Sequence, residues 1–186
     1  MRIVAGKLRG RKIEAPEGRD VRPTSDRVRE SLFDILAHGE TPLPDGATVA
    51  DIFCGTGAFG LEALSRGAIH AIFMDNDRTV MSLARRNAAQ LGVAGQATFL
   101  ERDARHPGAA PRPVDLLFLD APYRGDLTTP ALAALIQAGW CKPGAIIVIE
   151  LAKTEDVDLP AGCDAYDRRV YGKTKLIFAR YSGLKA

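Results

Sequence analysis

Cysteine and histidine are scarce in this sequence, with three of each among 186 residues. Cys54, Cys141 and Cys163 form no CxxC pair, and no cluster of His and Cys has the ligand spacing of a zinc site. We therefore expect no metal centre and three reduced, structural thiols. Cys54 lies beside a glycine-rich turn and is a candidate nucleophile. No histidine is near it in the sequence to activate it, so packing is its expected role.

Long hydrophobic runs and a strong bias toward one sign of charge are also missing. The longest apolar run, 145–149, is too short to cross a bilayer, and the first residues lack the apolar stretch and cleavage site of a secretory signal. A chain of this length fits one domain that buries roughly 70% of the surface its unfolded form exposes. We expect a cytoplasmic monomer that does not bind membranes.

The net charge of +2 conceals an uneven distribution along the chain. Residues 1–31 hold nine Lys/Arg and five Asp/Glu, a net charge of +4, which leaves sixteen and eighteen, a net charge of −2, for the rest. The densest basic stretch contains no acid, a pattern that fits phosphate binding and fits a solvated surface equally well. The candidate nucleic-acid contacts are Lys7, Arg9, Arg11 and Lys12, with Arg22 nearer the site.

The first 47 residues read as an appendage to the main domain. Residues 2–5 and 8–13 flank Gly6-Lys7, a connection typical of a tight hairpin with a type II′ turn. Thr24 or Ser25 can then cap a helix whose apolar residues recur at helical spacing: Val28, Leu32, Ile35 and Leu36. We expect an RNA-binding appendage over 1–47, ending in a Pro/Gly-rich linker at 39–46, and a catalytic domain over 48–186.

Beyond the linker, strand-like and helix-like segments alternate, which indicates a parallel sheet with crossover helices. The last two segments, around Gly172-Lys173, favour an antiparallel hairpin at one edge. The strands are apolar without polar alternation, as in a sheet covered on both faces. The expected strands are 48–53, 69–75, 97–100, 114–119, 145–150, 165–171 and 175–181, and the helices 58–66, 78–91 and 127–138.

Polar residues fall where the first three of these strands end, which is where open parallel sheets bind ligands. Gly55 and Gly57 remove β-carbons that would block a ligand, Asp75 is placed to accept ribose hydroxyls, and Asp103 to accept an adenine amino group. Asp51 would attract a cationic ligand; in the alternative view it only caps the next helix and the glycines only form a turn. The predicted cofactor contacts are Asp51, Phe53, Gly55, Thr56, Gly57, Asp75, Asn76, Asp103 and Ala104.

The turn also matches GxGxxG, the fingerprint of dinucleotide-binding enzymes, at Gly55, Gly57 and Gly60. The Asp51 carboxylate disfavours a pyrophosphate group close to it, and no basic residue lies within 55–60 to offset this negative charge. A sulfonium cofactor instead carries positive charge that a carboxylate attracts. S-adenosylmethionine is therefore favoured over NAD.

The segment Asp120-Ala121-Pro122-Tyr123 follows the fourth strand and is the candidate reacting site. The Asp120 carboxylate and the Ala121 carbonyl can each accept an N–H of a planar amine, orienting its lone pair toward an electrophilic methyl group. Tyr123 can stack on the ring, and Pro122 stiffens the turn. Without the cofactor signature, the same residues would read as an ordinary Pro-Tyr turn.

With these residues the chain resembles class I S-adenosylmethionine-dependent methyltransferases that carry an [Asn/Asp]-Pro-Pro-[Tyr/Phe] motif. It is most similar to the RsmD family of bacterial small-subunit ribosomal RNA guanine-N2 methyltransferases. The matching motifs are GKLRGR (6–11), RPT (22–24), RVRESLF (27–33), DIFCGTGxxGLEA (51–63) and YGKT (171–174).

The resemblance implies a Rossmann-like sheet of seven mostly parallel strands whose last strand is antiparallel. It implies methyl transfer to the 2-amino group of a guanine in 16S rRNA, within the small subunit or an assembly intermediate. Ala121 replaces the first proline of the usual motif, and Arg102 stands where a glycine often precedes the acid.

Other functions remain open at this point. A protein-glutamine or adenine-N6 methyltransferase would use the same clamp, and a non-catalytic RNA-binding assembly factor could keep the fold and the basic hairpin.

Overall fold

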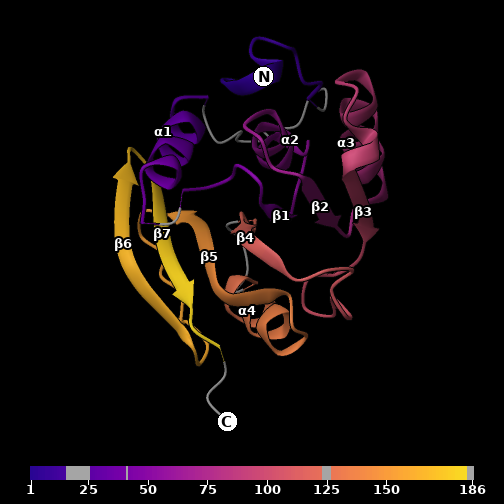
Figure 1. The fold of residues 1–186 in the computed structure, drawn as a ribbon. Helices are drawn as coiled ribbons and strands as arrows, with labels where there is room; N and C mark the ends of the chain where they lie inside the picture. The colour runs from indigo at the N-terminus through magenta and orange to yellow at the C-terminus, as the bar shows by residue number, and fades with distance from the viewer. Residues whose placement is uncertain (16–25, 41, 123–126, 184–186) are drawn as a thin grey trace.

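The computed structural model describes residues 1–15, 26–40, 42–122 and 127–183 and contains one seven-stranded sheet of order β3-β2-β1-β4-β5-β7-β6 (Figure 1). Strands β1 to β5 pair in parallel, and β7 lies antiparallel between β5 and β6, which confirms the predicted fold class. The strands are β1 Thr48–Ile52, β2 His70–Asp75, β3 Ala97–Glu101, β4 Val114–Leu119, β5 Cys141–Ala152, β6 Cys163–Tyr171 and β7 Thr174–Tyr181. The helices are α1 Asp26–Ala37, α2 Ala58–Ser65, α3 Arg78–Gln90 and α4 Thr128–Gln137, with 3-10 turns at Gly6–Leu8 and Ala94–Gln96.

Helices cover both faces of the sheet, as the apolar strands predicted. Helices α1, α2 and α3 lie on one face and α4 on the other (Figure 1). Successive strand residues point to opposite faces, so Val49 joins the cluster beneath α1 to α3 and Ala50 the cluster beneath α4. In the described part of the chain, no helix is long and apolar enough to span a membrane.

Helix α1 packs on the sheet, as its apolar spacing predicted. Leu32, Phe33 and Leu36 are buried and belong to the same cluster as Phe118 and Val148 of the central strands. Its predicted caps, Thr24 and Ser25, lie outside the described residues.

The N-terminal segment, residues 1–15, folds back on itself, but the predicted two-residue turn is wrong. Arg2 and Lys12 form a bridge, and the Ile3 amide donates to the Arg11 carbonyl at 2.9 Å. The connection is longer and contains the 3-10 turn Gly6–Leu8. Its shape follows Ser65 at the end of α2, whose hydroxyl donates to the Ala5 carbonyl and accepts the Leu8 amide.

A buried carboxylate holds the N-terminal segment to α2. Glu62 is completely buried and accepts the amides of Val4 and Ala5 at 2.7 and 2.9 Å. Its charge is compensated by Arg29, 3.5 Å away and itself 1% exposed, and by Arg66 at 2.9 Å. Charge-assisted hydrogen bonds of this kind stabilise a buried carboxylate.

Arg29 also binds α1 to the same network. Its guanidinium pairs with Asp26 at 2.9 Å and donates to the Arg2 carbonyl at 2.6 Å. The start of α1, the N-terminal segment and α2 thus share one set of ionic contacts.

Replacing Glu62 with glutamine should release the N-terminal segment. The amide group would turn an N–H toward a backbone donor and remove one of the two carboxylates that face Arg29, which should cost about 3 kcal/mol of unfolding free energy. Urea unfolding and amide hydrogen exchange at Val4 and Ala5 measure both effects. Glu101→Gln, an exposed change on β3, is the matched control. Slow exchange at both amides in the Glu62 variant would contradict this account.

Candidate active site at the carboxyl ends of strands β1 to β4

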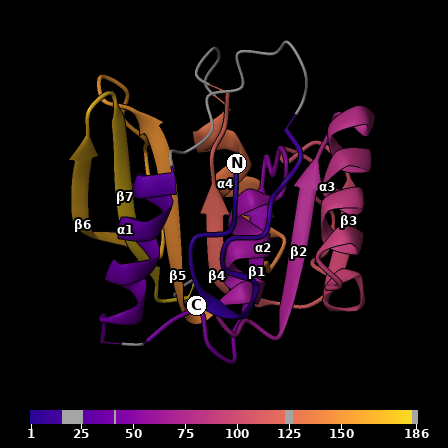
Figure 2. The ribbon, with the colours of Figure 1, turned by 90° about the horizontal axis from the view of Figure 1, so that it is seen from above.

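The chain leaves β1 toward β2 and β3 on one side, while β4 lies on its other side. Strand order therefore reverses between β1 and β4, where open α/β sheets bind their ligands. The two strand ends are joined by the Asp120 amide, which donates to the Ile52 carbonyl at 3.4 Å. In Figure 2 the arrowheads of β2 and β4 point to this same edge of the sheet. The structure thus gathers the ends of β3, β2, β1 and β4, with their predicted acids, along one edge.

The turn after β1 has an unusual backbone. Phe53 has φ of 59°, and among the described residues it is the one non-glycine residue in the left-handed region. Gly55 and Gly57 follow with φ of 53° and 78°. The Cys54 amide donates to Met74 of β2 and the Gly57 amide to Cys54, at 3.0 and 2.7 Å. Such held, sparsely populated conformations cluster at functional sites.

The glycines of this turn serve two different purposes. A β-carbon on Gly55 would meet nothing within 4 Å, so this residue leaves open space above the turn. A β-carbon on Gly57 or Gly60 would lie 3.1 or 2.4 Å from the buried ring of Phe73. Gly57 was expected to clear room for a ligand, but its missing β-carbon allows α2 to pack closely on β2. The open cradle at Gly55 fits the close approach of a nucleoside cofactor.

Asp51 is held inside the protein. It is 2% exposed, and one of its oxygens accepts the Gly60 amide in the first turn of α2 at 2.9 Å. Burial raises the pKa of this carboxyl to about 8, with Asp75 adding to the rise and the Gly60 hydrogen bond opposing it. The helix-capping contact considered from the sequence is therefore present.

Asp75 at the end of β2 contacts the turn directly. One of its oxygens accepts the Gly55 amide at 3.2 Å and the other the Asp77 amide at 3.0 Å. A carboxylate offers about four acceptor positions, so two remain for hydroxyl donors. Asn76, which lies between Asp75 and Asp77 in the sequence, is exposed.

Asp103 after β3 has a partner that the sequence prediction did not include. Arg105 donates to both of its oxygens, with the shortest distance 2.7 Å, and the Arg105 amide donates as well. These hydrogen bonds lower the pKa of Asp103 to about 2. An adenine amino group would share this carboxylate with Arg105, a pairing that the Asp-x-Arg spacing could have suggested. Ala104 beside it is buried.

The predicted reacting segment is only partly described. Asp120 is half-buried, Ala121 is 5% exposed and Pro122 is exposed. The predictions for Tyr123 and Arg22 lie outside the described residues.

Cys54, the candidate nucleophile weighed from the sequence, packs inside. Its sulfur lies 3.7 Å from that of Met81, and burial raises the pKa of its thiol well above the ordinary value. A thiol in this environment is not a reactive thiolate. Across the described residues, no group of three or more His, Cys, Asp or Glu is placed to hold a metal.

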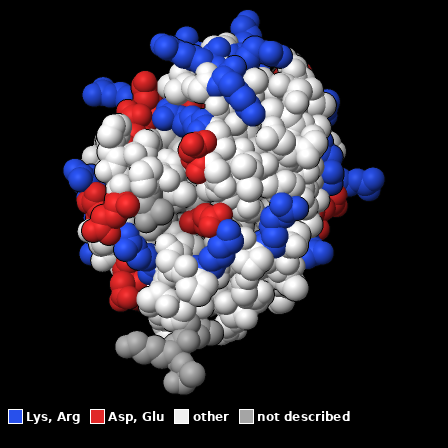
Figure 3. Space-filling model, viewed as in Figure 1, with Lys and Arg blue, Asp and Glu red and all other residues white. Residues whose placement is uncertain are grey.

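The basic residues of the N-terminal segment lie far along α3 from the strand ends. The Lys7 ammonium is 3.5 Å from Gln96, before β3, and Arg11 donates to the Gln90 carbonyl at the end of α3. A helix that follows a parallel strand runs back toward the strand's amino end, so these contacts lie away from the carboxyl ends of the strands. Lys and Arg side chains gather over this segment at the top of Figure 3.

Two lysines at the candidate edge were missed by the sequence prediction. Lys153 follows β5 and Lys173 lies in the turn between β6 and β7; both are exposed. The Lys153 amide donates to the Lys173 carbonyl at 2.8 Å, so the two are neighbours. The YGKT motif was the signal that could have indicated Lys173.

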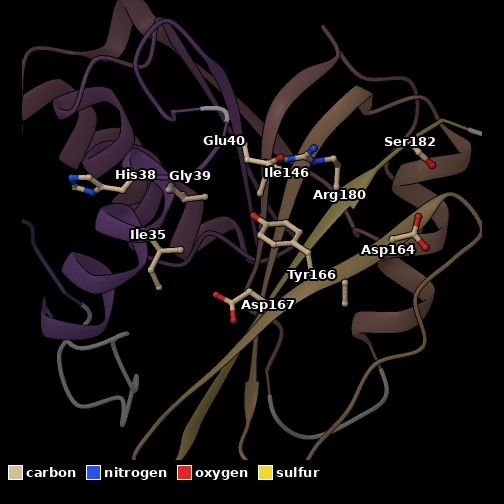
Figure 4. A pocket seen from close by; sticks show the side chains of 12 residues that line it. Ile35, His38, Gly39, Glu40, Ile146, Asp164, Tyr166, Asp167, Arg180 and Ser182 are labelled. Atoms are coloured by element: carbon tan, nitrogen blue, oxygen red, sulfur yellow. The ribbon is translucent and has the colours of Figure 1, made fainter.

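A pocket of about 630 Å³ lies elsewhere, between the end of α1 and strands β6 and β7. Its wall includes the pair Arg180 and Glu40, 3.0 Å apart, beside the ring of Tyr166 (Figure 4). Because β6 begins and β7 ends here, the pocket is at the amino edge of the sheet and contains none of the predicted site residues.

The raised pKa of Asp51 predicts a pH dependence of stability. From its ordinary value of 3.8 up to about 8, the folded state keeps a proton that the unfolded state has lost. Protonated Asp51 therefore makes its full contribution to the stability of the folded state below about pH 4. This contribution is lost as the pH rises toward 8. Urea unfolding between pH 5 and 8 should show a steeper fall in the wild type than in Asp51→Asn, by at most about 1.4 kcal/mol per pH unit.

Asparagine can still accept the Gly60 amide, so the Asp51→Asn comparison isolates the titration. Asp164→Asn, an exposed change on β6, should keep the wild-type slope. Parallel curves for wild type and Asp51→Asn would show that Asp51 titrates normally.

Comparison with known proteins places the chain in a family. A family model described as conserved hypothetical protein 95 matches residues 1–180. Ribosomal RNA small subunit methyltransferase D of Escherichia coli K12 is 36% identical over 175 residues, covering 93% of this chain and 86% of that protein. The solved structure of yhhF from Escherichia coli is 34% identical, with a TM-score of 0.84 over 98% of both chains.

A more distant solved structure shows a ligand. It is a SAM-dependent methyltransferase from Thiobacillus denitrificans in complex with S-adenosyl-L-homocysteine. It is 26% identical, with a TM-score of 0.54, and the match covers 66% of this chain and 46% of that one. Since the family model and a 36% identical relative both span most of the sequence, the chain belongs to the RsmD family, a family of enzymes with the Rossmann-like fold of class I methyltransferases.

Proposed function

We propose that this chain transfers a methyl group from S-adenosylmethionine to the 2-amino group of a guanine in 16S ribosomal RNA. The observation that carries the proposal is the junction of β1 and β4, where Asp120 adjoins the strand that leads into the glycine turn. The name of the Escherichia coli relative supports a small-subunit ribosomal RNA as the substrate class. The guanine itself is inferred from the family.

The residues along this edge suit the proposed cofactor. The missing β-carbon of Gly55 leaves open space above the turn, and Asp75 has acceptor positions for ribose hydroxyls. Asp51 places a buried carboxyl beneath the turn. Bound S-adenosylmethionine supplies the methyl group as an electrophile. A cationic ligand near Asp51 favours its ionised form and so lowers its pKa. The remaining proposed contacts are Phe53, Thr56, Gly57, Asn76, Asp103 and Ala104.

At the reacting end, the protein's task is to orient a weak nucleophile. The lone pair of an exocyclic amine is delocalised into the base, so acceptors for its N–H groups help to direct it. Asp120 and the Ala121 carbonyl take this role, and Asp120 or water accepts the proton released after transfer. We assign stacking on the base to Tyr123 and rigidity of the turn to Pro122.

The position of the basic segment favours a large RNA. Helix α3 has 13 residues and is about 20 Å long, and Lys7 and Arg11 contact its last residue and the turn that follows it, away from the carboxyl ends of the strands. A single nucleotide cannot reach both places, whereas folded RNA can place phosphates at the segment while one base is extruded into the site. Lys153 and Lys173 supply positive charge beside the site itself. An assembled or assembling small subunit meets these requirements.

Replacing Asp120 with alanine should lower methyl transfer at least about 10²-fold, because an acceptor that acts mainly in the transition state is lost. Binding of S-adenosylhomocysteine should change less than about twofold. Transfer of labelled methyl groups to small subunits from cells lacking this chain measures the first effect and calorimetry the second. Asp158→Ala, an exposed change after β5, is the control. Full activity of the Asp120 variant would remove Asp120 from the mechanism.

Three further measurements separate the alternative functions. Mapping methylated nucleotides in ribosomal RNA from cells with and without this chain identifies the base. Binding of NAD in place of S-adenosylmethionine would indicate an oxidoreductase. A cellular role that survives Asp120→Ala intact would indicate a non-catalytic assembly factor.

Replacing Lys7, Arg9 and Arg11 together with alanine should weaken binding to the small subunit and flatten its salt dependence. Loss of three phosphate contacts reduces the slope of log K against log salt by about 2 to 3. The control replaces Arg112, Lys142 and Arg168, which are exposed away from the N-terminal segment. Filter binding at several salt concentrations compares the two sets. Equal slopes would dismiss the N-terminal segment as an RNA contact.

A further inference from the structure

Asn87 in α3 connects the glycine turn, to which we assign cofactor binding, with the N-terminal segment, to which we assign RNA binding. Its side chain is 1% exposed. The amide oxygen accepts the Glu14 N–H at 2.9 Å, and the amide nitrogen donates to the Glu14 carbonyl at 3.1 Å and to the Thr56 carbonyl at 3.0 Å. Both N–H donors and the oxygen are therefore in use. The side chain thus pairs with both the N–H and the carbonyl of Glu14, as the backbone of a neighbouring strand would.

The two partners of Asn87 belong to the two proposed binding regions. Thr56 stands between Gly55 and Gly57 in the turn that forms the cofactor cradle. Glu14 is in the N-terminal segment, which carries the basic residues. A second contact joins the same parts, since the Thr56 hydroxyl lies 3.7 Å from the Met1 sulfur. Thr56 is itself 5% exposed, so its contact with Asn87 is buried, whereas Glu14 at the other end of the junction is exposed.

Buried polar contacts of this kind are costly to break singly. A Thr56 carbonyl that lost Asn87, or an Asn87 side chain that lost Glu14, would be left without a partner in a buried environment. The glycine turn is therefore most stable when the N-terminal segment is in place. The N-terminal segment is likewise most stable when the turn keeps this conformation.

We infer that Asn87 is a positioning residue that makes cofactor binding and RNA binding cooperative. RNA that binds the N-terminal segment in this arrangement also stabilises the glycine turn through Asn87, and a cofactor that fixes the turn stabilises the segment. Coupling of this type is reciprocal, so each ligand raises the affinity of the other by the same factor. The RNA half of the inference rests on the proposed function, whereas the link between segment and turn does not.

The main test compares the affinity of labelled S-adenosylmethionine with and without saturating small subunits from cells lacking this chain. For the wild type we expect the subunits to raise the affinity at least about fivefold. Asn87→Asp keeps the size and one acceptor but loses both donors. It should weaken cofactor binding about tenfold and reduce the coupling to less than about twofold.

Steady-state kinetics should show the same defect as a raised KM for S-adenosylmethionine with kcat nearly unchanged at saturation, a split that general loss of folded protein would not produce. Ser82→Ala is the matched control, because Ser82 is an exposed residue of α3 whose hydroxyl donates to the Arg78 carbonyl of the same helix. It should keep cofactor affinity within about twofold of the wild type. Wild-type coupling in a folded Asn87→Asp variant would overturn the inference.

A measurement on the unaltered chain tests the link even if the variant fails to fold. S-adenosylhomocysteine should slow amide hydrogen exchange at Glu14, since a fixed turn holds Asn87 against it. Unchanged exchange at Glu14 with the turn protected would also overturn the inference. If the chain binds the cofactor but neither binds nor methylates small subunits, the proposed RNA substrate fails, and the exchange at Glu14 still decides the link.

Discussion

The reversal of strand order at β1 is the constraint on which the site depends. With β2 on one side and β4 on the other, the turn after β1 and the segment after β4 leave the sheet side by side, and crossover helices cannot fill the space between them. Each side chain there is then placed by a strand end whose position the sheet ladder already determines. The proposed cofactor contact at Gly55 and the proposed acceptor at Asp120 are placed by these two neighbouring strand ends.

Helix α2 transmits this arrangement to the rest of the molecule. Its first turn is capped by Asp51 from β1, and its close approach to β2 depends on Gly57 and Gly60 facing Phe73. Its later residues, Glu62 and Ser65, hold the N-terminal segment. One short helix thus contacts the cofactor turn at one end and the basic segment at the other, and Asn87 closes the same connection from α3.

Two buried carboxylates in this region show how environment decides chemistry. Glu62 accepts two backbone amides and faces two arginines, so its charge is compensated where it lies. Asp51 accepts one amide, lies near the like charge of Asp75 and has its pKa raised by burial. The first is suited to holding structure together. Under the proposed function, a cationic ligand near the second would favour its ionised form.

From the sequence alone, the apolar strands, the crossover pattern and the acids at strand ends could be predicted, because side-chain periodicity and parallel pairing follow from local chemistry. The two-residue turn at Gly6-Lys7 was wrong because Ser65, distant in sequence, reshapes that loop. The packing of Gly57 against Phe73 was likewise set by a distant residue, whereas the partner of Asp103, Arg105, lies two residues away and its spacing could have suggested it. The sequence by itself determined the fold class of the sheet and the family. The tertiary structure alone decided which groups are buried, what compensates them, and that Asn87 joins Glu14 to Thr56, because burial and hydrogen-bond partners come from residues far apart in the chain.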